Sequence, residues 1–131
     1  MSLIQMLKER GLLDGIGVQG HSLESISGSE LKASLDRLAT LSLPIYISEL
    51  DIQGDDDTQL SIYQRLFSVM WEHPGIYGIS LWGYKQGLIW RPTAYLLRSG
   101  GSERPALTWL KNFVAAHPKK APNAPANLRA N

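Results

Sequence analysis

Residues 44–52 of the chain read Pro44-Ile45-Tyr46-Ile47-Ser48-Glu49-Leu50-Asp51-Ile52. A proline, a run of β-branched and aromatic residues and a following turn at residues 54–57 predict a short buried strand. Because strand side chains alternate with a period of two, the acids Glu49 and Asp51 should share one face. That face should also carry Ile45 and Ile47, and the opposite face Tyr46, Ser48, Leu50 and Ile52. A carboxylate on an apolar strand is costly unless it is paired or functional, so the two acids are either a solvated strand end or candidate site residues.

Helices and strands are predicted to alternate along the rest of the chain. Apolar residues at helical spacing, or in short runs, predict helices over residues 3–13, 27–41, 55–71 and 105–114 and strands over residues 15–20, 44–52 and 76–83. The strands follow one another at intervals of about 30 residues, the length of a βαβ unit, and no two-residue hairpin turn joins them. The sequence therefore predicts an α/β fold with a parallel sheet, right-handed crossovers and outer helices.

Three parallel strands are too few to close a barrel. Such a small sheet leaves both edges unpaired and one face bare, so we expect the chain to be part of a larger structure. Ile45 and Ile47 are expected to line the interior of that structure. On its own, the chain is expected to form a homo-oligomer through its open edges and apolar face.

Composition excludes several classes of function. The chain has 131 residues, 44% of them hydrophobic, and a net charge of +1, which fits one globular unit with a core. It has no cysteine, which excludes disulfides and thiol chemistry, and no basic run with interleaved aromatic residues that would indicate nucleic-acid binding. No apolar run reaches the roughly 18 residues of a membrane span, and residues 1–6 do not resemble a signal peptide. No metal-ligand spacing or phosphate-binding glycine loop is present, so no metal or cofactor is expected.

Polar and aromatic residues gather where the predicted strands end. Ligands of parallel α/β folds bind at the carboxyl ends of the strands. These ends carry Gln19 and His21, then Glu49 and Asp51, then Trp82, with Trp90 in the long loop that follows. A lone histidine is more often structural than catalytic, but an imidazole beside two acids can bridge and orient the carboxylates. The indoles of Trp82 and Trp90 would provide flat platforms for a sugar ring.

These segments resemble glycoside hydrolase family 10, the retaining endo-β-1,4-xylanases, which are built on a TIM (β/α)8 barrel. The resemblance lies in Gly15-Ile16-Gly17-Val18-Gln19-Gly20-His21, in Ile47-Ser48-Glu49-Leu50-Asp51-Ile52, and in Leu81-Trp82-Gly83 with Trp90 at the family's interval. It covers most of residues 3–116. The resemblance implies that the chain is the last three βα units of the barrel, with strands six to eight.

The resemblance also implies roles for the residues at the strand ends. Glu49 would be the catalytic nucleophile, His21 would hydrogen-bond both Glu49 and the sugar, and Asp51 would hold His21 in place. The substrate contacts would come from Gln19 near the cleavage point and from Trp82 and Trp90 on the glycone side. The implied substrate is xylan or a xylo-oligosaccharide, and the implied location is extracellular.

The chain departs from the family's pattern in two ways. Residues 84–89 read Tyr84-Lys85-Gln86-Gly87-Leu88-Ile89, where the family commonly has small and acidic residues, which leaves the subsite preferences open. The family's acid/base glutamate lies at the end of the fourth strand and has no counterpart in this chain. A retaining glycosidase needs two carboxyl groups about 5–5.5 Å apart, and Asp51 cannot readily serve because it flanks Glu49 on the same strand. The isolated chain is therefore expected to be inactive.

Two other functional interpretations are open at this point. The chain could belong to another TIM-barrel β-glycosidase, since those also place a nucleophilic glutamate on the seventh strand, or it could be a non-catalytic carbohydrate-binding fragment that uses Trp82 and Trp90. The Gln-x-His pattern of residues 19–21 favours family 10. Carbohydrate-binding modules are mostly β-sandwiches, so the helix-rich alternation argues against the second interpretation.

The chain divides into a predicted barrel segment, residues 1–117, and a predicted proline-rich linker, residues 118–131. The barrel segment would need the missing N-terminal part of the barrel as its partner. Residues 122–130 have a weaker resemblance to the lead-in of a fibronectin type III module.

Overall fold

The computed structural model describes residues 2–119 and contains one sheet of three parallel strands in the order β1-β2-β3. The strands are β1 (Ile16–Val18), β2 (Ile45–Leu50) and β3 (Ile76–Leu81), and the helices are α1 (Ser2–Glu9), α2 (Gly28–Ala39), α3 (Asp56–Glu72) and α4 (Pro105–Ala116). The predicted alternation and the parallel pairing are confirmed. The linker predicted for residues 118–131 lies almost wholly outside the described residues.

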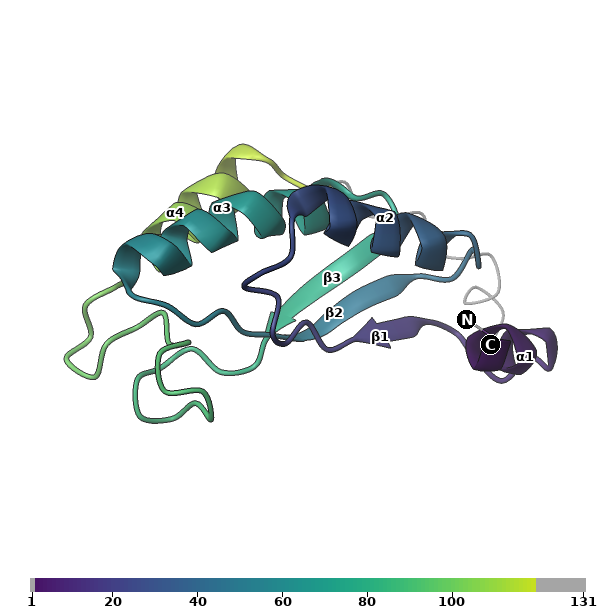
Figure 1. The fold of residues 1–131 in the computed structure, drawn as a ribbon, viewed down its shortest axis with the longest axis horizontal. Coiled ribbons are helices and arrows are strands. Elements are labelled where there is room, and N and C mark those ends of the chain that lie inside the picture. Colours follow the sequence, from purple (N-terminus) through teal and green to yellow (C-terminus); the bar gives the residue numbers. More distant parts are fainter. Residues whose placement is uncertain (1, 120–131) are drawn as a thin grey trace.

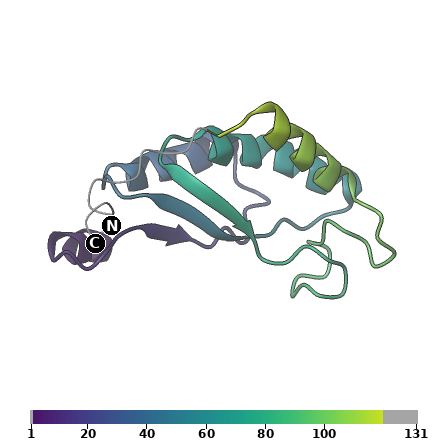
Figure 2. The same ribbon diagram turned by 180° about the vertical axis from the view of Figure 1, so that it is seen from behind.

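Three helices cover one face of the sheet and leave the other face open. Figures 1 and 2 show α2, α3 and α4 side by side above the strands, whereas α1 lies apart, beyond the amino end of β1. Ile45 and Ile47 are 0% and 1% exposed and belong to the core that the strands form with the helices. Tyr46, in contrast, is 45% exposed. The expectation that Ile45 and Ile47 line a barrel interior is therefore wrong, because they face the helices and Tyr46 faces the open side.

A bulge in β2 breaks the alternation that the sequence predicts. Ile47 pairs with Ile79 and Leu50 pairs with Leu81, so three steps along β2 match two steps along β3. An extra residue of this kind turns the following side chains relative to a regular strand. Leu50 and Ile52, which the alternation places with exposed Tyr46 and Ser48, are 0% and 1% exposed. The bulge thus includes Glu49 and lies immediately before Asp51, the two acids of the candidate site.

Side chains at the helix ends explain where α2 and α3 begin. Ser27 caps α2 in a capping box, in which its hydroxyl accepts from the Glu30 N–H and the Glu30 carboxylate accepts from the Ser27 N–H. Asp55 caps α3 by accepting from the Thr58 N–H at 2.8 Å. Both caps fall where the sequence predicts helix starts.

A buried arginine fixes the long loop between β3 and α4 to the start of α3. Arg104 is 2% exposed, and its Nε donates to Asp56 Oδ1 at 2.6 Å. Its two other nitrogens donate to the carbonyl oxygens of Gly54 at 2.7 Å and of Thr93 and Tyr95 at 2.8 and 3.1 Å. The guanidinium therefore ties the loop between β3 and α4, which carries Trp90, to Gly54 and to the first turn of α3.

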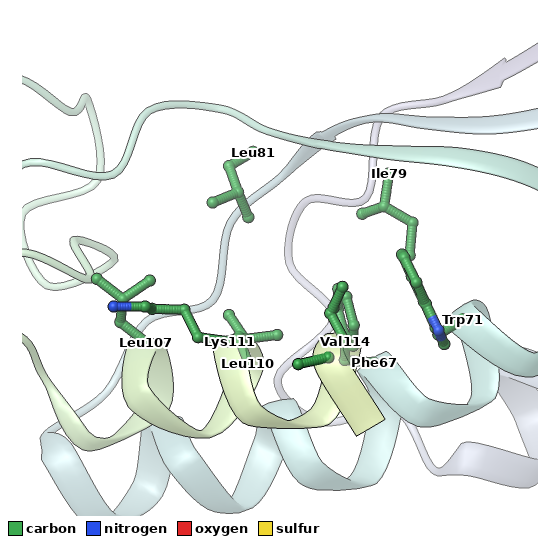
Figure 3. A pocket seen from close by; sticks show the side chains of 9 residues that line it. Phe67, Trp71, Ile79, Leu81, Leu107, Leu110, Lys111 and Val114 are labelled. Carbon is green, nitrogen blue, oxygen red and sulfur yellow. The ribbon is translucent and has the colours of Figure 1, made fainter. Parts of the chain in front are cut away.

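An apolar groove lies between the outer edge of β3 and α4 (Figure 3). The groove is lined by Ile79 and Leu81 of β3, Phe67 and Trp71 of α3, and Leu107, Leu110, Lys111, Val114 and Ala115 of α4. Within residues 2–119, no further strand pairs with the outer edge of β1 or of β3. Both edges of the sheet, and the face opposite α2, α3 and α4, are therefore open, as predicted (Figure 1).

No helix in the described part of the chain is long and apolar enough to cross a membrane.

We expect Arg104→Met to destabilise the chain strongly. The substitution leaves the carbonyl oxygens of Gly54 and Thr93 without their donor and Asp56 without its main partner, and each buried acceptor left unpaired costs about 1–3 kcal/mol. Urea unfolding followed by tryptophan fluorescence would measure the loss. Lys111→Met is the matched control, because Lys111 pairs with Glu103 in solvent and should matter little. Equal effects of the two substitutions would contradict this role of Arg104.

Candidate active site at the carboxyl ends of the strands

The carboxyl ends of the three strands meet at one rim and are joined by backbone hydrogen bonds. The Glu49 N–H donates to the Gln19 carbonyl at 2.9 Å, and the Trp82 N–H donates to the Leu50 carbonyl at 3.1 Å. These bonds continue the parallel pairing beyond the ends of the regular strands. The rim therefore collects the residues that the sequence singles out.

His21 lies between Glu49, near the end of β2, and Asp51, which directly follows β2. Its Nε2 is 3.0 Å from Glu49 Oε2, and its Nδ1 is 3.0 Å from Asp51 Oδ1. The contact with Glu49 is a hydrogen bond, whereas the contact with Asp51 is a close ion-pair contact without good hydrogen-bond alignment. The side chains of His21 and Glu49 are 19% and 23% exposed, and that of Asp51 is 0% exposed. Glu49 is thus the one of the two acids that solvent, or a substrate, can reach.

A turn rather than a strand presents His21 to the acids. β1 ends at Val18, and Gly20 has a φ of +83°, a conformation that favours glycine. A Cβ atom at position 20 would also lie 3.0 Å from Ile47 Cγ2. On a regular strand, Gln19 and His21 would share one face because they are two residues apart, but this expectation does not hold, since both lie beyond the end of β1. The Gln19 side chain is exposed on the rim, and within residues 2–119 it makes no hydrogen bond to the cluster.

Asp51 is held by partners from the loop that follows β3. Its Oδ2 accepts from Trp90 Nε1 at 2.7 Å, and its Oδ1 accepts from Arg91 Nη1 at 2.8 Å. Burial by itself would raise the pKa of the Asp51 carboxyl group, but the hydrogen bond from Arg91, the adjacent His21 ring and the hydrogen bond from Trp90 outweigh burial and lower that pKa. Asp51 is therefore a buried, ionised carboxylate.

The same charges set the protonation of His21. Burial opposes the charged imidazolium, but the carboxylates of Asp51 and Glu49 outweigh burial and raise the pKa of the His21 imidazole. A protonated His21 donates from both ring nitrogens and can hold the two carboxylates in a fixed arrangement.

Trp82 and Trp90 form exposed walls beside the histidine. Their ring centroids lie 6.3 and 5.4 Å from that of His21, both in edge-on geometry, and the two tryptophans are 48% and 64% exposed. Trp90 is fixed through its indole N–H to Asp51, so its ring faces remain free. Such exposed aromatic faces beside a carboxylate suit the binding of a sugar ring.

The structure adds Arg91 and Glu24, which our sequence analysis did not single out. Arg91 Nη2 lies 2.9 Å from Glu24 Oε1, while Nη1 binds Asp51. Arg91 directly follows a candidate tryptophan in the sequence, which is the one signal that could have drawn attention to it. Glu24 carries no comparable signal, because its relation to Arg91 depends on the fold.

Of the two acids at this site, Glu49 is the one available to a bound molecule. No group of three or more histidine, cysteine or acidic side chains within the described range could hold a metal ion. Asp51 already has three partners and no exposed surface, so it cannot act on a bound molecule directly. Glu49, oriented by His21 and partly exposed between the tryptophans, is the group that can attack an electrophilic carbon.

We expect the stabilisation that His21 provides to decline as the pH rises. Because its pKa is raised in the folded chain, this contribution is fully present below the unfolded value of about 6.5 and is lost as the pH rises through the folded value. The free energy of unfolding of the wild-type chain minus that of His21→Gln should therefore fall as the pH rises above about 6.5. Urea titrations across this range would measure it, with His117→Gln at the exposed end of α4 as control. A difference that grows with pH would contradict the raised pKa.

The chain is similar to known xylanases in sequence and in structure. It is 40% identical over 113 residues to Endo-1,4-beta-xylanase B of Cellvibrio japonicus, an alignment that covers 83% of this chain and 19% of that protein. It is 34% identical over 93 residues to Anti-sigma-I factor RsgI6 of Acetivibrio thermocellus, covering 70% of this chain and 12% of that protein. Its structure superposes on xylanase 10B of Thermotoga petrophila, solved in complex with xylobiose, with a TM-score of 0.78 and 26% identity.

These similarities extend along most of this chain but along a minor part of each relative. The superposition covers 88% of this chain and 40% of the xylanase 10B chain, so the three βα units correspond to part of a complete barrel. The model of the family named Glycosyl hydrolase family 10 matches residues 1–113, which include every strand and every residue of the candidate site. The chain therefore belongs to glycosyl hydrolase family 10, and its fold is the segment of the family's TIM barrel with the last three βα units.

Proposed function

We propose that this chain is the nucleophile-bearing part of a retaining endo-β-1,4-xylanase that acts on xylan or xylo-oligosaccharides. The main observation behind this proposal is the partly exposed carboxylate of Glu49, which is hydrogen-bonded to His21. The buried carboxylate of Asp51 contacts the other ring nitrogen of His21 and holds the ring in place. Support comes from the similarity to Endo-1,4-beta-xylanase B and from the likeness to a xylanase solved with xylobiose.

In the proposed mechanism, Glu49 attacks the anomeric carbon of a β-1,4-linked xylose unit. A bond forms between its carboxylate oxygen and that carbon while the glycosidic carbon–oxygen bond breaks, and the leaving oxygen takes a proton from a neutral carboxylic acid. Water, deprotonated by the same acid/base group, then attacks the anomeric carbon and releases Glu49. His21 supports the first step by donating to the Glu49 carboxylate and fixing the direction of attack.

The acid/base carboxyl group is expected to come from a part of the barrel outside this chain. Asp51, the nearest acid to Glu49 along β2, is fully buried and holds His21, Trp90 and Arg91. A group with these three partners cannot also give a proton to a leaving oxygen. The isolated chain therefore carries half of the catalytic pair, and we expect it to be inactive.

The glycone side of the substrate would lie against the exposed rings of Trp82 and Trp90. Both are within 6.3 Å of the His21 ring, measured between centroids, so a sugar stacked there would meet His21 and Glu49 at its edge. The exposed Gln19 side chain is free to contact the substrate from the β1 side. We assign Gln19, His21, Trp82 and Trp90 to substrate binding.

The remainder of the barrel is the partner that the open surfaces require. The groove beside β3 exposes the apolar side chains of Ile79, Leu81 and Leu107, and the strand edges carry unpaired backbone groups. In a closed barrel these surfaces would pack against the N-terminal units. We also propose an extracellular location, since xylan is a polysaccharide outside the cell.

A second candidate function is the recognition of a glycan without hydrolysis. The similarity to a protein named as an anti-sigma factor indicates that this barrel segment also occurs in a protein with a regulatory name. The tryptophan walls would serve either function. A parent protein without an acid/base carboxyl group opposite Glu49 would favour recognition over catalysis.

We expect the isolated 131-residue chain to self-associate. Two unpaired strand edges and the apolar groove between β3 and α4 would be covered by a second copy in the absence of the rest of the barrel. Multi-angle light scattering at micromolar concentration should give a mass above that of the monomer. Leu81→Lys, within the groove, should weaken the association, and Leu3→Lys on the distant α1 is the matched control. A well-folded monomer would contradict the proposal.

We expect Glu49 to be the residue that an activated 2-fluoro-xylobioside labels in the complete enzyme. The fluorine slows release of the glycosyl-enzyme, so peptide mapping by mass spectrometry would locate the adduct. Glu49→Gln should lower kcat at least 10⁴-fold, roughly the effect of losing a nucleophile. The 131-residue chain, assayed beside the enzyme for release of reducing sugar, should show no hydrolysis. A label on another residue would overturn the assignment of Glu49.

A further inference from the structure

Arg91 bridges two carboxylates at the back of the proposed active site. Its Nη1 lies 2.8 Å from Asp51 Oδ1, its Nη2 lies 2.9 Å from Glu24 Oε1, and its side chain is 13% exposed. A planar guanidinium can bind two acids at once from one fixed fork, which the single ammonium group of lysine cannot reproduce.

Other contacts hold the far side of this bridge in place. Glu24 Oε1 also accepts from the Gln53 N–H at 2.9 Å, and the Glu24 carbonyl accepts from Arg65 Nη2 at 2.7 Å. With the Gln53 amide oxygen turned toward Arg91, it accepts from Nη2 at 2.8 Å and from Nε at 3.2 Å. With Gln53 in this orientation, all three nitrogens of the guanidinium have acceptors.

Asp51 passes this constraint on to the histidine. The same oxygen, Oδ1, that binds Arg91 lies 3.0 Å from His21 Nδ1, while Oδ2 is taken by Trp90. A carboxylate with both oxygens bound cannot rotate without breaking one of these contacts. His21 in turn has its second ring nitrogen 3.0 Å from Glu49 Oε2. A continuous chain of contacts therefore runs from Glu24 through Arg91, Asp51 and His21 to the nucleophile.

We propose that Arg91, anchored by Glu24, is a positioning residue for the reaction: it sets the orientation of Asp51 and, through Asp51, that of His21 against Glu49. Within residues 2–119, no hydrogen bond or ion pair joins Arg91 to Glu49, so Arg91 acts on Glu49 through Asp51 and His21. The expected effect on the reaction rests on the proposed function, whereas the expected effect on the orientation of Asp51 and His21 concerns this chain alone.

The charges around His21 define what a titration of its ring reports. Asp51 and Glu49 contact the ring directly, and Arg91 and Glu24 lie beyond Asp51. Tyr63 of α3 also lies near Asp51, and burial, followed by the Asp51 charge, raises the pKa of its phenol, so Tyr63 remains neutral. The variant Arg91→Lys keeps the total charge, so a change in the titration of His21 then reports a change in geometry.

The test is a histidine NMR titration of the 131-residue chain and its variants. In Arg91→Lys we expect Asp51 to lose its fixed orientation and the pKa of His21 to fall toward the unperturbed value of about 6.5. Glu24→Gln, which leaves Arg91 in place but weakens its anchor, should lower that pKa in the same direction by less. Arg98→Lys is the matched control, because Arg98 lies in the same loop, pairs with Asp56 and should leave His21 unchanged.

A folded Arg91→Lys chain in which His21 titrates as in the wild type would overturn the proposal. If Arg91→Lys does not give a dispersed spectrum, Glu24→Gln decides, and an unchanged His21 in that variant would overturn it equally.

Kinetics of the complete enzyme separate this proposal from the proposed function. Arg91→Lys should lower kcat for xylan by about tenfold to a hundredfold, with little change in KM, since a displaced nucleophile slows the chemistry without removing a substrate contact. A raised KM with unchanged kcat would contradict a positioning role. If the wild-type enzyme does not hydrolyse xylan, the proposed function fails, and the titration of His21 still decides whether Arg91 positions Asp51.

Discussion

The buried carboxylate of Asp51 is the group around which the candidate site is assembled. A carboxylate with no exposed surface is costly unless donors surround it, and here His21, Trp90 and Arg91 provide them. These partners come from the turn after β1 and from the loop after β3, on either side of β2. One charge therefore ties three separate segments together, and the exposed acid, Glu49, inherits its position from this arrangement.

The loop after β3 depends on a second buried charge at its base. Arg104 binds Asp56 at the start of α3 and the carbonyl groups of Gly54, Thr93 and Tyr95. Gln59 of α3 adds hydrogen bonds from its side-chain amide to the carbonyl oxygens of Ile52 and Tyr95, at 2.9 and 3.2 Å. Long loops without regular structure are otherwise mobile, and these bonds give the loop a fixed base from which Trp90 and Arg91 can reach Asp51. The rim at the strand ends and the helix layer are thus connected through the loop between β3 and α4.

The chain combines a well-connected cluster around Glu49 with surfaces that a complete barrel would cover. Every contact among Glu49, His21, Asp51 and Arg91 is made within the chain itself, whereas the groove beside β3 and both sheet edges lack a neighbour among residues 2–119. The position of Glu49 is therefore determined by contacts within the chain, whereas closure of the barrel needs further strands and helices. Our proposal assigns the acid/base group, and with it the ability to turn over substrate, to the part of the barrel outside this chain.

The sequence by itself determined the order of the elements, their parallel arrangement and the meeting of His21, Glu49 and Asp51 at one rim. Hydrophobic periodicity and local caps such as Ser27 and Asp55 act over a few residues, so they can be read directly from the chain. Parallel strands then bring their carboxyl ends together whatever the details of their packing.

Only the tertiary structure decided which way the side chains of β2 face and which residues support Asp51. The bulge between Ile47 and Leu50 is a feature of the pairing between β2 and β3, and a regular alternation, which omits it, wrongly placed Leu50 with exposed Tyr46. The prediction that Ile45 and Ile47 line a barrel interior was also wrong, because the helices cover that face of the sheet. Arg91 lies 40 positions from Asp51 in the sequence, and Glu24 lies still further from Arg91. Ion pairs over such separations depend on the path of the whole backbone, and no local pattern in the sequence encodes that path.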